Sequence, residues 1–432
     1  MARRTSRSPY RQLATRIMAR LDELSLLTSE QGGLTRLYLS KEHKSAADLI
    51  TGWMRDAGMT ARVDAAGTVT GRLDGKQPGG KQPEGTRRDA RTLLIGSHID
   101  TVRNAGRFDG TLGVVLAIEA VAELQRTSRS LPFAIEILAF GDEEGVRFPC
   151  TLTGSRAVAG SFDPASLEAA DADGVSLRQA LADFGCDPAR IGQVARDQGA
   201  VLGYIEVHIE QGPVLEKEGQ PVGVVTAISG ASRYQVTVGG MAGHAGTLPM
   251  PMRRDALTAA AEMVLAIEAI ARGEAGLVAT VGQIAARPGA VNVVPGEVVF
   301  TIDVRSPVDG TRRTGIRQIE RDLKTIARRR HCTIQLTETY SEKAATCDQR
   351  FIRHFSAAIE RVAGNAIGLP SGAGHDGLAM AQLCPIGMLF VRCNGGISHH
   401  PTESVKSEDV EVATRVLIEF LDQVSPTGRS IA

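Results

Sequence analysis

The chain has 432 residues, a length that predicts two domains because a single hydrophobic core rarely grows so large. Its 49 basic and 49 acidic residues give a net charge of +0 and aromatic residues make up only 4%, so the composition favours neither nucleic acid nor a membrane surface as partner. The six cysteines show no CxxC spacing and are expected to be free thiols in a reducing, cytoplasmic compartment.

The first half of the chain begins with predicted helices. The basic start, residues 1–11, has no apolar run behind it and is expected to be a disordered tail. Apolar residues recur at helical spacing over 12–27. A second helix is expected from Ser45, with Ser45 as its N-cap and Gly58 just past its end. Residues 75–90, rich in Gly, Pro and charge, are expected to form an exposed loop.

An α/β core is predicted after this loop. The nearly continuous apolar runs TLLIGS (92–97) and FAIEILAFG (133–141) suit strands that are buried on both faces, as in a mixed or parallel sheet. Residues 113–127 between them have a helical pattern. In such a strand–helix–strand order, ligand sites lie at the carboxyl ends of the strands.

Around Thr226 the pattern changes to that of a second domain. Strands are expected over 234–240, 277–286, 297–306 and 332–340, and long helices over 253–273 and 315–330. The order β-α-β-β-α-β is that of a split βαβ sandwich. Apolar runs of the first type resume after about residue 340, so an insertion is expected. One domain would comprise 1–226 and 341–432, and the inserted domain would comprise 227–340.

Acidic and imidazole side chains recur beside glycine where apolar runs give way to loops. They lie in the segments TLLIGSHIDTV, GRFDGTLGV, AFGDEEGVRFP, YIEVHIEQGP and GGISHHPTE. Neutral imidazoles and carboxylates can bind two metal ions, one carboxylate can bridge the ions, and a spare carboxylate can carry a proton. The set predicts a water-splitting enzyme with two metal ions.

Each segment alone also admits a structural interpretation. The HID sequence can be a capping turn, and Asp109 can be a helix N-cap. Glu143 and Glu144 can form a solvated acidic turn, His208 can be a hydrogen-bonded core histidine, and the SHHP sequence can be an exposed loop. Clustered carboxylates, however, repel one another unless cations compensate, and the joint occurrence of five such segments favours the metal site.

These segments resemble the M20-type dimetal amidohydrolases, in the branch that contains allantoate amidohydrolase, N-carbamoyl-L-amino-acid hydrolase and β-ureidopropionase. The resemblance extends from about Arg11 to Leu421 and includes GHAGTLPM, NVVPG and SGAGHDG. FPCTLTGSRAVAG and MLFVRCNGGISHHP look closest to allantoate amidohydrolases. The resemblance implies an α/β catalytic domain whose mixed central sheet is flanked by helices, and an inserted β-α-β-β-α-β domain that acts as a lid and dimerises.

The resemblance also implies a set of site residues. One divalent ion, zinc or manganese, would be held by His98, Asp109 and His208, and a second by Asp109, Glu144 and His399, so that Asp109 bridges the two. Glu143 would be the general base and acid, and Asp100 would orient His98. The neighbouring His400 is the competing candidate for the place of His399.

Five further residues match substrate-contacting positions of these enzymes. Gln211 and His375 belong to the catalytic domain, and His244, Asn292 and Arg305 to the inserted one. An arginine presents a forked donor to a carboxylate, and a histidine can stabilise a developing oxyanion. Without the resemblance, His244, Asn292 and Arg305 would be a turn histidine, a loop asparagine and a strand-end surface arginine, and His375 a structural loop residue.

The predicted function is hydrolysis of the ureido C–N bond of allantoate, with release of ammonia and carbon dioxide, by a cytoplasmic homodimer. The alternatives are an N-carbamoyl-L-amino-acid hydrolase and a β-ureidopropionase, whose substrates also carry a ureido group and a carboxylate. An aminoacylase or dipeptidase is disfavoured by HIEQGP and GHAG. A non-enzymatic dimeric binding protein of the same fold would be favoured by loss of Glu143 or of a metal ligand, and the chain retains them all.

Overall fold

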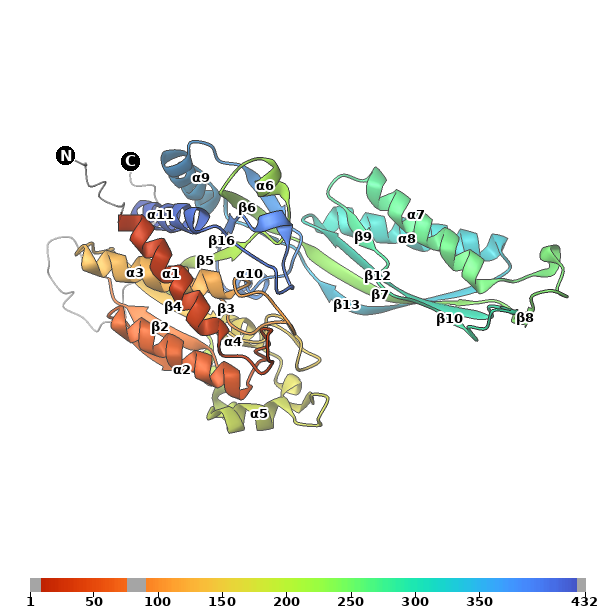
Figure 1. The fold of residues 1–432 in the computed structure, drawn as a ribbon, viewed down its shortest axis with the longest axis horizontal. Coiled ribbons are helices and arrows are strands. Elements are labelled where there is room, and N and C mark those ends of the chain that lie inside the picture. Colours follow the sequence, from red (N-terminus) through yellow and green to blue (C-terminus); the bar gives the residue numbers. More distant parts are fainter. Residues whose placement is uncertain (1–8, 76–90, 426–432) are drawn as a thin grey trace. The chain divides into compact units, whose positions relative to one another are not determined.

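The computed structural model describes residues 9–75 and 91–425, drawn in Figure 1. Most of the predicted tail and of the predicted loop over 75–90 therefore lies outside the described residues. The chain divides into two compact units. The first comprises Met1–Thr226, Cys347–Leu369 and His375–Ala432, and the second comprises Ala227–Thr346 and Pro370–Gly374. Among the described residues, no helix combines the length and apolar character needed to cross a membrane.

A mixed sheet forms the centre of the first unit. Its strands follow the order β1-β2-β4-β3-β5-β16-β6, and β15 also pairs with β6. The strands are β1 (Thr60–Val63), β2 (Val69–Leu73), β3 (Thr92–His98), β4 (Ala134–Phe140), β5 (Val201–Ile209), β6 (Val222–Ile228), β15 (Gly368–Ser371) and β16 (Ile386–Val391). The four central strands β4, β3, β5 and β16 run parallel, and β1, β2 and β6 pair antiparallel. Every residue of the parallel strands β3, β4, β5 and β16 is buried, as their continuous apolar runs predict.

Helices flank this sheet. They are α1 (Pro9–Ser25), α2 (Lys41–Asp56), α3 (Thr111–Arg126), α4 (Thr153–Ala159), α5 (Leu177–Phe184), α6 (Val214–Lys217), α9 (Gln349–Ala363), α10 (Gly377–Met380) and α11 (Ser407–Gln423). Helix α3 contacts β3, β4 and β5 directly, and α1 and α11 pack on α3. The predicted α/β fold with a mixed central sheet and flanking helices is confirmed.

The start of α2 differs from the prediction. The N-cap is Ser40, whose side chain accepts a hydrogen bond from the amide of His43. Ser45 lies one turn inside the helix, where its hydroxyl donates to the carbonyl of Lys41. The prediction was wrong because residues 41–44 contain Lys and Glu, which are good helix formers and extend the helix back to the earlier serine.

The second unit is an antiparallel sheet covered by two helices. The strands β7 (Gly230–Gly239), β9 (Val278–Thr280), β10 (Ile284–Arg287), β12 (Glu297–Ser306) and β13 (Thr333–Glu342) follow the order β10-β12-β7-β13, with β9 also pairing with β12. Helices α7 (Ala256–Gly273) and α8 (Asp309–Arg329) lie side by side on the sheet (Figure 1). Buried and half-buried residues alternate along β12, and its buried residues, Phe300 among them, form the core with Met263 and Leu323 of the helices.

Two details of the second unit depart from the predicted pattern. The strand predicted over 277–286 is broken at 281–283 into β9 and β10, which both pair with β12. A short ribbon of β8 (Gly243–His244) and β11 (Val293–Val294) was not predicted, because two residues per strand give no readable period.

The second unit also extends beyond the predicted boundary at residue 340. Strand β13 continues to Glu342, and β14 (Ala345–Thr346) pairs with Ala227 and Ile228. Residues 370–374 belong to the same unit because the carbonyl of Ser371 accepts from the amide of Ser229 at 2.9 Å.

Candidate metal centre

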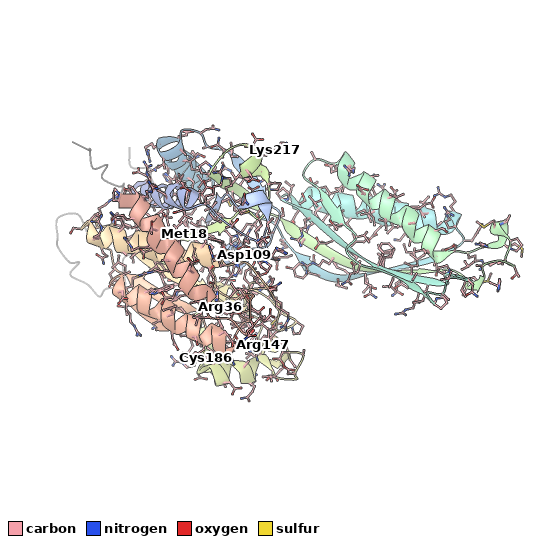
Figure 2. The ribbon with its side chains drawn as sticks, viewed as in Figure 1. Met18, Arg36, Asp109, Arg147, Cys186 and Lys217 are labelled. Atoms are coloured by element: carbon pink, nitrogen blue, oxygen red, sulfur yellow. The ribbon has the colours of Figure 1, made fainter. Side chains whose placement is uncertain are left out.

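The acidic and imidazole segments meet at one edge of the first unit's sheet. His98 ends β3, His208 lies near the end of β5, and the Glu143–Glu144 loop follows β4. His399 lies in the loop after β16. Asp109, labelled in Figure 2, precedes α3. Because β3, β4, β5 and β16 are parallel, their carboxyl ends bring together residues that are far apart in the sequence.

The candidate ligand atoms gather in three groups, two of which share Asp109. One group is His98, Asp109 and His208, another is Asp109, Glu144 and His399, and a third is His98, Glu143 and Glu144; within each group the ligand atoms lie within 4.8 Å of one another. The first two groups are the predicted ligand sets. Asp109 Oδ1 lies 3.1 Å from Nε2 of His208, and its Oδ2 lies 3.2 Å from Nε2 of His399. The two oxygens of Asp109 thus face different imidazoles, as a bridging carboxylate requires. The role of each side chain as a ligand stays a prediction.

Backbone carbonyl groups orient the two buried imidazoles, His98 and His208. Nδ1 of His98 lies 3.1 Å from the carbonyl oxygen of Asp100, and Nδ1 of His208 lies 2.9 Å from that of Ile209. A carbonyl oxygen can only accept, so both Nδ1 atoms carry hydrogen, and in the neutral imidazole Nε2 is the atom left to bind a cation. These Nε2 atoms are 3.4 Å apart and both face Asp109. Such a concentration of lone pairs and negative charge fits a divalent cation.

Burial and charge oppose each other in the carboxylate cluster. Burial, reinforced by the charge of Asp109, raises the pKa of Glu144 to about 7. Burial also raises the pKa of Glu143 well above its usual value, although the charge of His98 opposes the shift. Burial would raise the pKa of Asp109 too, but hydrogen bonds from the imidazoles, His208 first, hold it well below its usual range. Protons and bound cations therefore compete for this cluster.

The two adjacent glutamates differ in their surroundings. Glu144 Oε2 lies 3.5 Å from Nε2 of His399, and its Oε1 is buried without a hydrogen-bond partner among the described residues. Glu143 Oε2 lies 3.8 Å from Nε2 of His98, and Glu143 belongs to neither group that contains Asp109 but to the third group, with His98 and Glu144. Its role in proton transfer and the role of Glu144 as a ligand stay predictions.

Asp100 holds both the histidine and the glutamate loop. Its carboxylate oxygens accept from the amides of Glu143, at 3.2 Å, and Glu144, at 3.3 Å. Its carbonyl oxygen is the nearer partner of His98 Nδ1, while Oδ1 is 3.7 Å away. In this structure Asp100 contacts His98 mainly through the backbone, because its carboxylate is engaged by the two amides.

Uncommon backbone conformations concentrate at this site. Asp142, Gln211 and His399 have φ of 69°, 57° and 56°, in the left-handed region that non-glycine residues seldom adopt. Gly110 also has a positive φ, and a Cβ there would lie 2.5 Å from the ring of His98, so only glycine fits. The side-chain amide of Gln211 donates to Asp109 Oδ2 at 2.9 Å, so Gln211 lies in direct contact with a candidate ligand.

His375 and His400 have different places. The buried ring of His375 packs edge-on against His208, with 4.5 Å between centroids, and burial lowers its pKa well below the usual value. His375 is therefore a neutral neighbour of a candidate ligand. His400 is exposed, its Nδ1 lies 2.7 Å from Oγ1 of Thr402, and it belongs to none of the three groups.

The other predicted substrate residues belong to the second unit. His244 ends β8 and Asn292 directly precedes β11, and the carbonyl of Asn292 accepts from the amide of Ala245. Arg305 lies at the opposite end of β12, where its guanidinium forms a bidentate pair with Asp303, at 2.8 and 3.0 Å.

Four residues that support the site were not predicted from the sequence. Arg36 is fully buried, and its Nε donates to the carbonyl of Ile99, which fixes the turn after β3. Ser398 donates to Asp109 Oδ2, and Glu403 accepts from the amide of Asp109. The fourth is Glu206, which accepts from the amide of Gly377. Glu206 had a readable signal, because an acid two residues before His208 on a fully buried strand must have a polar partner.

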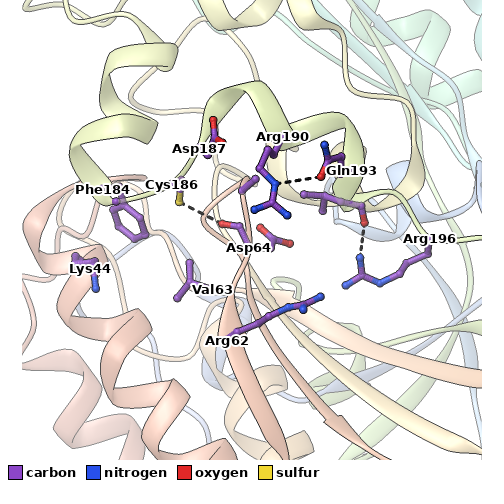
Figure 3. A pocket seen from close by; sticks show the side chains of 13 residues that line it. Lys44, Arg62, Val63, Asp64, Phe184, Cys186, Asp187, Arg190, Gln193 and Arg196 are labelled. Atoms are coloured by element: carbon purple, nitrogen blue, oxygen red, sulfur yellow. Dashed lines mark hydrogen bonds between the residues drawn. The ribbon is translucent and has the colours of Figure 1, made fainter. Parts of the chain in front are cut away.

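A cavity of about 490 Å³ lies apart from these residues in the first unit (Figure 3). Phe184, Cys186 and Asp64 line it together with four cationic residues, and none of the candidate ligands does. These cations point to no particular chemistry, because Arg196 pairs with Glu136, Lys44 pairs with Asp48, and Arg62 and Arg190 are exposed.

Comparisons with known proteins agree on one family. Residues 94–423 match the model of peptidase family M20/M25/M40. The chain is 41% identical to an N-carbamoyl-L-amino acid amidohydrolase of Geobacillus stearothermophilus, over 95% of this chain and 98% of that one. It is 39% identical to an allantoate deiminase of Arabidopsis thaliana, over 94% and 81%. A solved amidase of the hydantoinase/carbamoylase family from Burkholderia multivorans superposes with a TM-score of 0.86 and 32% identity, covering 94% of this chain and 97% of that one.

Proposed function

The chain belongs to the M20/M25/M40 peptidase family and is a hydrolase of C–N bonds, and from this premise we propose that it cleaves the ureido C–N bond of allantoate. The alternatives are an N-carbamoyl-L-amino acid and β-ureidopropionate. The observation that carries the proposal is the pair of candidate ligand groups that share Asp109, with Glu143 outside both of them. The segments FPCTLTGSRAVAG and MLFVRCNGGISHHP favour allantoate among these substrates.

The residues of the site divide into binding and proton-transfer groups. Two divalent ions, held by His98, Asp109 and His208 and by Asp109, Glu144 and His399, would polarise the carbonyl and lower the pKa of water. Glu143 takes a proton from the water that attacks the ureido carbonyl and passes it to the nitrogen that leaves. The burial that raises the pKa of Glu143 favours the protonated form needed for the second transfer. The carbamate released from the ureido group then decomposes to ammonia and carbon dioxide.

A substrate panel tests the proposal. Ammonia release is measured with allantoate, N-carbamoyl-L-amino acids and β-ureidopropionate, each with and without added Mn²⁺ or Zn²⁺. We expect the highest kcat/KM with allantoate and a requirement for metal. Higher kcat/KM with one of the other two would replace allantoate by that substrate, and no turnover of any ureido compound would refute the proposal.

Arg305 is proposed to bind the carboxylate of the substrate through its planar fork. In the structure its guanidinium binds the carboxylate of Asp303 in a bidentate geometry. This contact supports the proposal that Arg305 can bind the carboxylate of a substrate in the same way. Arg305→Ala should lower kcat/KM about ten- to a hundredfold, mainly through KM, because a charge-assisted pair is lost. Arg305→Lys should rescue only partly. The measurement compares allantoate with its neutral amide, and an unchanged preference for the acid would assign the carboxylate to Arg233 or Arg392.

We propose that the active unit is a homodimer in which the second unit supplies His244 to the partner's site. The second unit exposes apolar side chains on α7, β9 and β10, including Leu265 (65% exposed), Val278 (60%) and Ile284 (51%), which a partner would cover. Mixing inactive Glu143→Gln and His244→Ala proteins should then restore activity, because one site of each hybrid has both residues intact. Subunit exchange is verified by mass spectrometry, and hybrids that form but stay inactive would place His244 in its own subunit.

A further inference from the structure

We propose that Glu403 is a positioning residue that holds the loops of Asp109 and His399 at a fixed separation, and that it does so as a hydrogen-bond acceptor. The inference rests on the proposed two-metal function. Glu403 belongs to neither predicted ligand set and has no part in the proposed proton transfer.

The contacts of Glu403 join the two loops. Its Oε1 accepts from the amides of Phe108, at 2.8 Å, and Asp109, at 3.1 Å. Its Oε2 lies 3.1 Å from the hydroxyl oxygen of Ser398, which directly precedes His399. Glu403 is only 5% exposed, so these three contacts replace water around its carboxylate. The buried side chain of Glu403 thus contacts the backbone of one candidate ligand, Asp109, and the residue that precedes another, His399.

Ser398 closes this arrangement into a ring of contacts. Its hydroxyl oxygen also lies 2.5 Å from Oδ2 of Asp109, the oxygen that faces His399. The loop that carries Ser398 is tied at its base, where the amide of Asn394 donates to the carbonyl of Ser404 at 2.9 Å. Movement of Glu403 would therefore change the separation between Asp109 and His399, and leave His98 and His208 on their strands.

Gly106 provides the space for this carboxylate. A Cβ at position 106 would overlap Cβ, Cδ and Oε1 of Glu403. Gly106 has no positive φ, so alanine suits its backbone, and the three atoms nearest to the added Cβ all belong to Glu403. Gly106→Ala is therefore a second way to displace Glu403, one that leaves the charge and every donor in place.

The acceptor role predicts an order among the variants of Glu403. In Glu403→Gln the amide oxygen can accept from Phe108 and Asp109, and the NH₂ group can donate to Ser398, which keeps its hydrogen for Asp109. Glu403→Ala leaves two buried amides without an acceptor and frees the loop. Metal binding should therefore be nearly retained with glutamine and impaired with alanine.

The test measures metal affinity instead of turnover. Purified variants are dialysed to equilibrium against graded Mn²⁺, and bound metal is counted by elemental analysis. Loss of a partner behind the ligands typically weakens metal affinity about 10- to 100-fold, and we expect this for one ion in Glu403→Ala and, in the same direction, in Gly106→Ala. Glu123→Ala is the matched control, because Glu123 is also a buried glutamate, and among the described residues its carboxylate pairs with Arg126 at the far end of α3.

The outcomes separate this inference from the proposed function. Unchanged affinity for both ions in Glu403→Ala would overturn the inference, even if the wild type hydrolyses allantoate. Equal losses in Glu403→Gln and Glu403→Ala would also overturn it, because the charge would then matter and the contacts would not. If Glu403→Ala does not fold, as judged by circular dichroism, Gly106→Ala decides alone. A wild type without ureidohydrolase activity would refute the proposed function and leave the metal measurement valid.

Discussion

Replacing Glu143 by glutamine is expected to lower kcat by about 10²–10⁴-fold while both metal ions stay bound. Glutamine keeps the size and polarity of the side chain but cannot take up the proton of the attacking water. Glu143 lies outside both ligand groups that contain Asp109, so metal content should be unaffected. The measurements are steady-state kinetics and elemental analysis of the same preparation.

The adjacent residue provides the control for this experiment. Glu144→Gln makes the same chemical change one position along the chain, but Glu144 belongs to the group of Asp109 and His399. It should lose metal as well as activity. If the two variants exchange these results, the roles of the two glutamates are reversed. A kcat near that of the wild type in metal-replete Glu143→Gln would remove Glu143 from the reaction.

Removal of the metal ions by a chelator should abolish activity, and Mn²⁺ or Zn²⁺ should restore it. The two histidines of the SHHP loop differ in their contacts in the structure. His399 lies 3.2 Å from Asp109 Oδ2, whereas His400 is exposed and contacts Thr402. His399→Ala should therefore lose most of one ion, and His400→Ala should bind both ions like the wild type. If elemental analysis finds the reverse, the ligand register is shifted by one residue.

The sequence predicts best what depends on local pattern. Uninterrupted apolar runs predict the buried parallel strands, and because such strands carry ligand sites at their carboxyl ends, the runs also predict that His98 and His208 share one edge of a sheet. Helices α3, α7 and α8 follow from the spacing of their apolar residues. Asp109 was ambiguous between metal ligand and N-cap, and the structure places Gly110 at the N-cap, where no side-chain cap forms.

What the sequence did not predict depends on partners that are distant along the chain. The sequence around Glu403 does not indicate that its carboxylate accepts hydrogen bonds from the amides of Phe108 and Asp109, which are nearly three hundred residues away. The break between β9 and β10 includes Gly282 and Gln283, but only the separate pairing of the two strands with β12 distinguishes it from an irregularity within one strand. The end of the second unit near 346 depends on the pairing of β14 with Ala227 and Ile228.

The wide spread of the candidate ligands along the chain has a consequence for folding. The ligands lie between His98 and His399 and become neighbours only when the parallel strands have paired. No short segment of the chain contains both ligand sets, so the ions would bind the native state in preference to the unfolded chain. By mass action, one ion at a hundred times its Kd would then stabilise the native state by about 2.7 kcal/mol. The metal supply of the cell would thereby govern how long this protein survives proteolysis, as well as how fast it works.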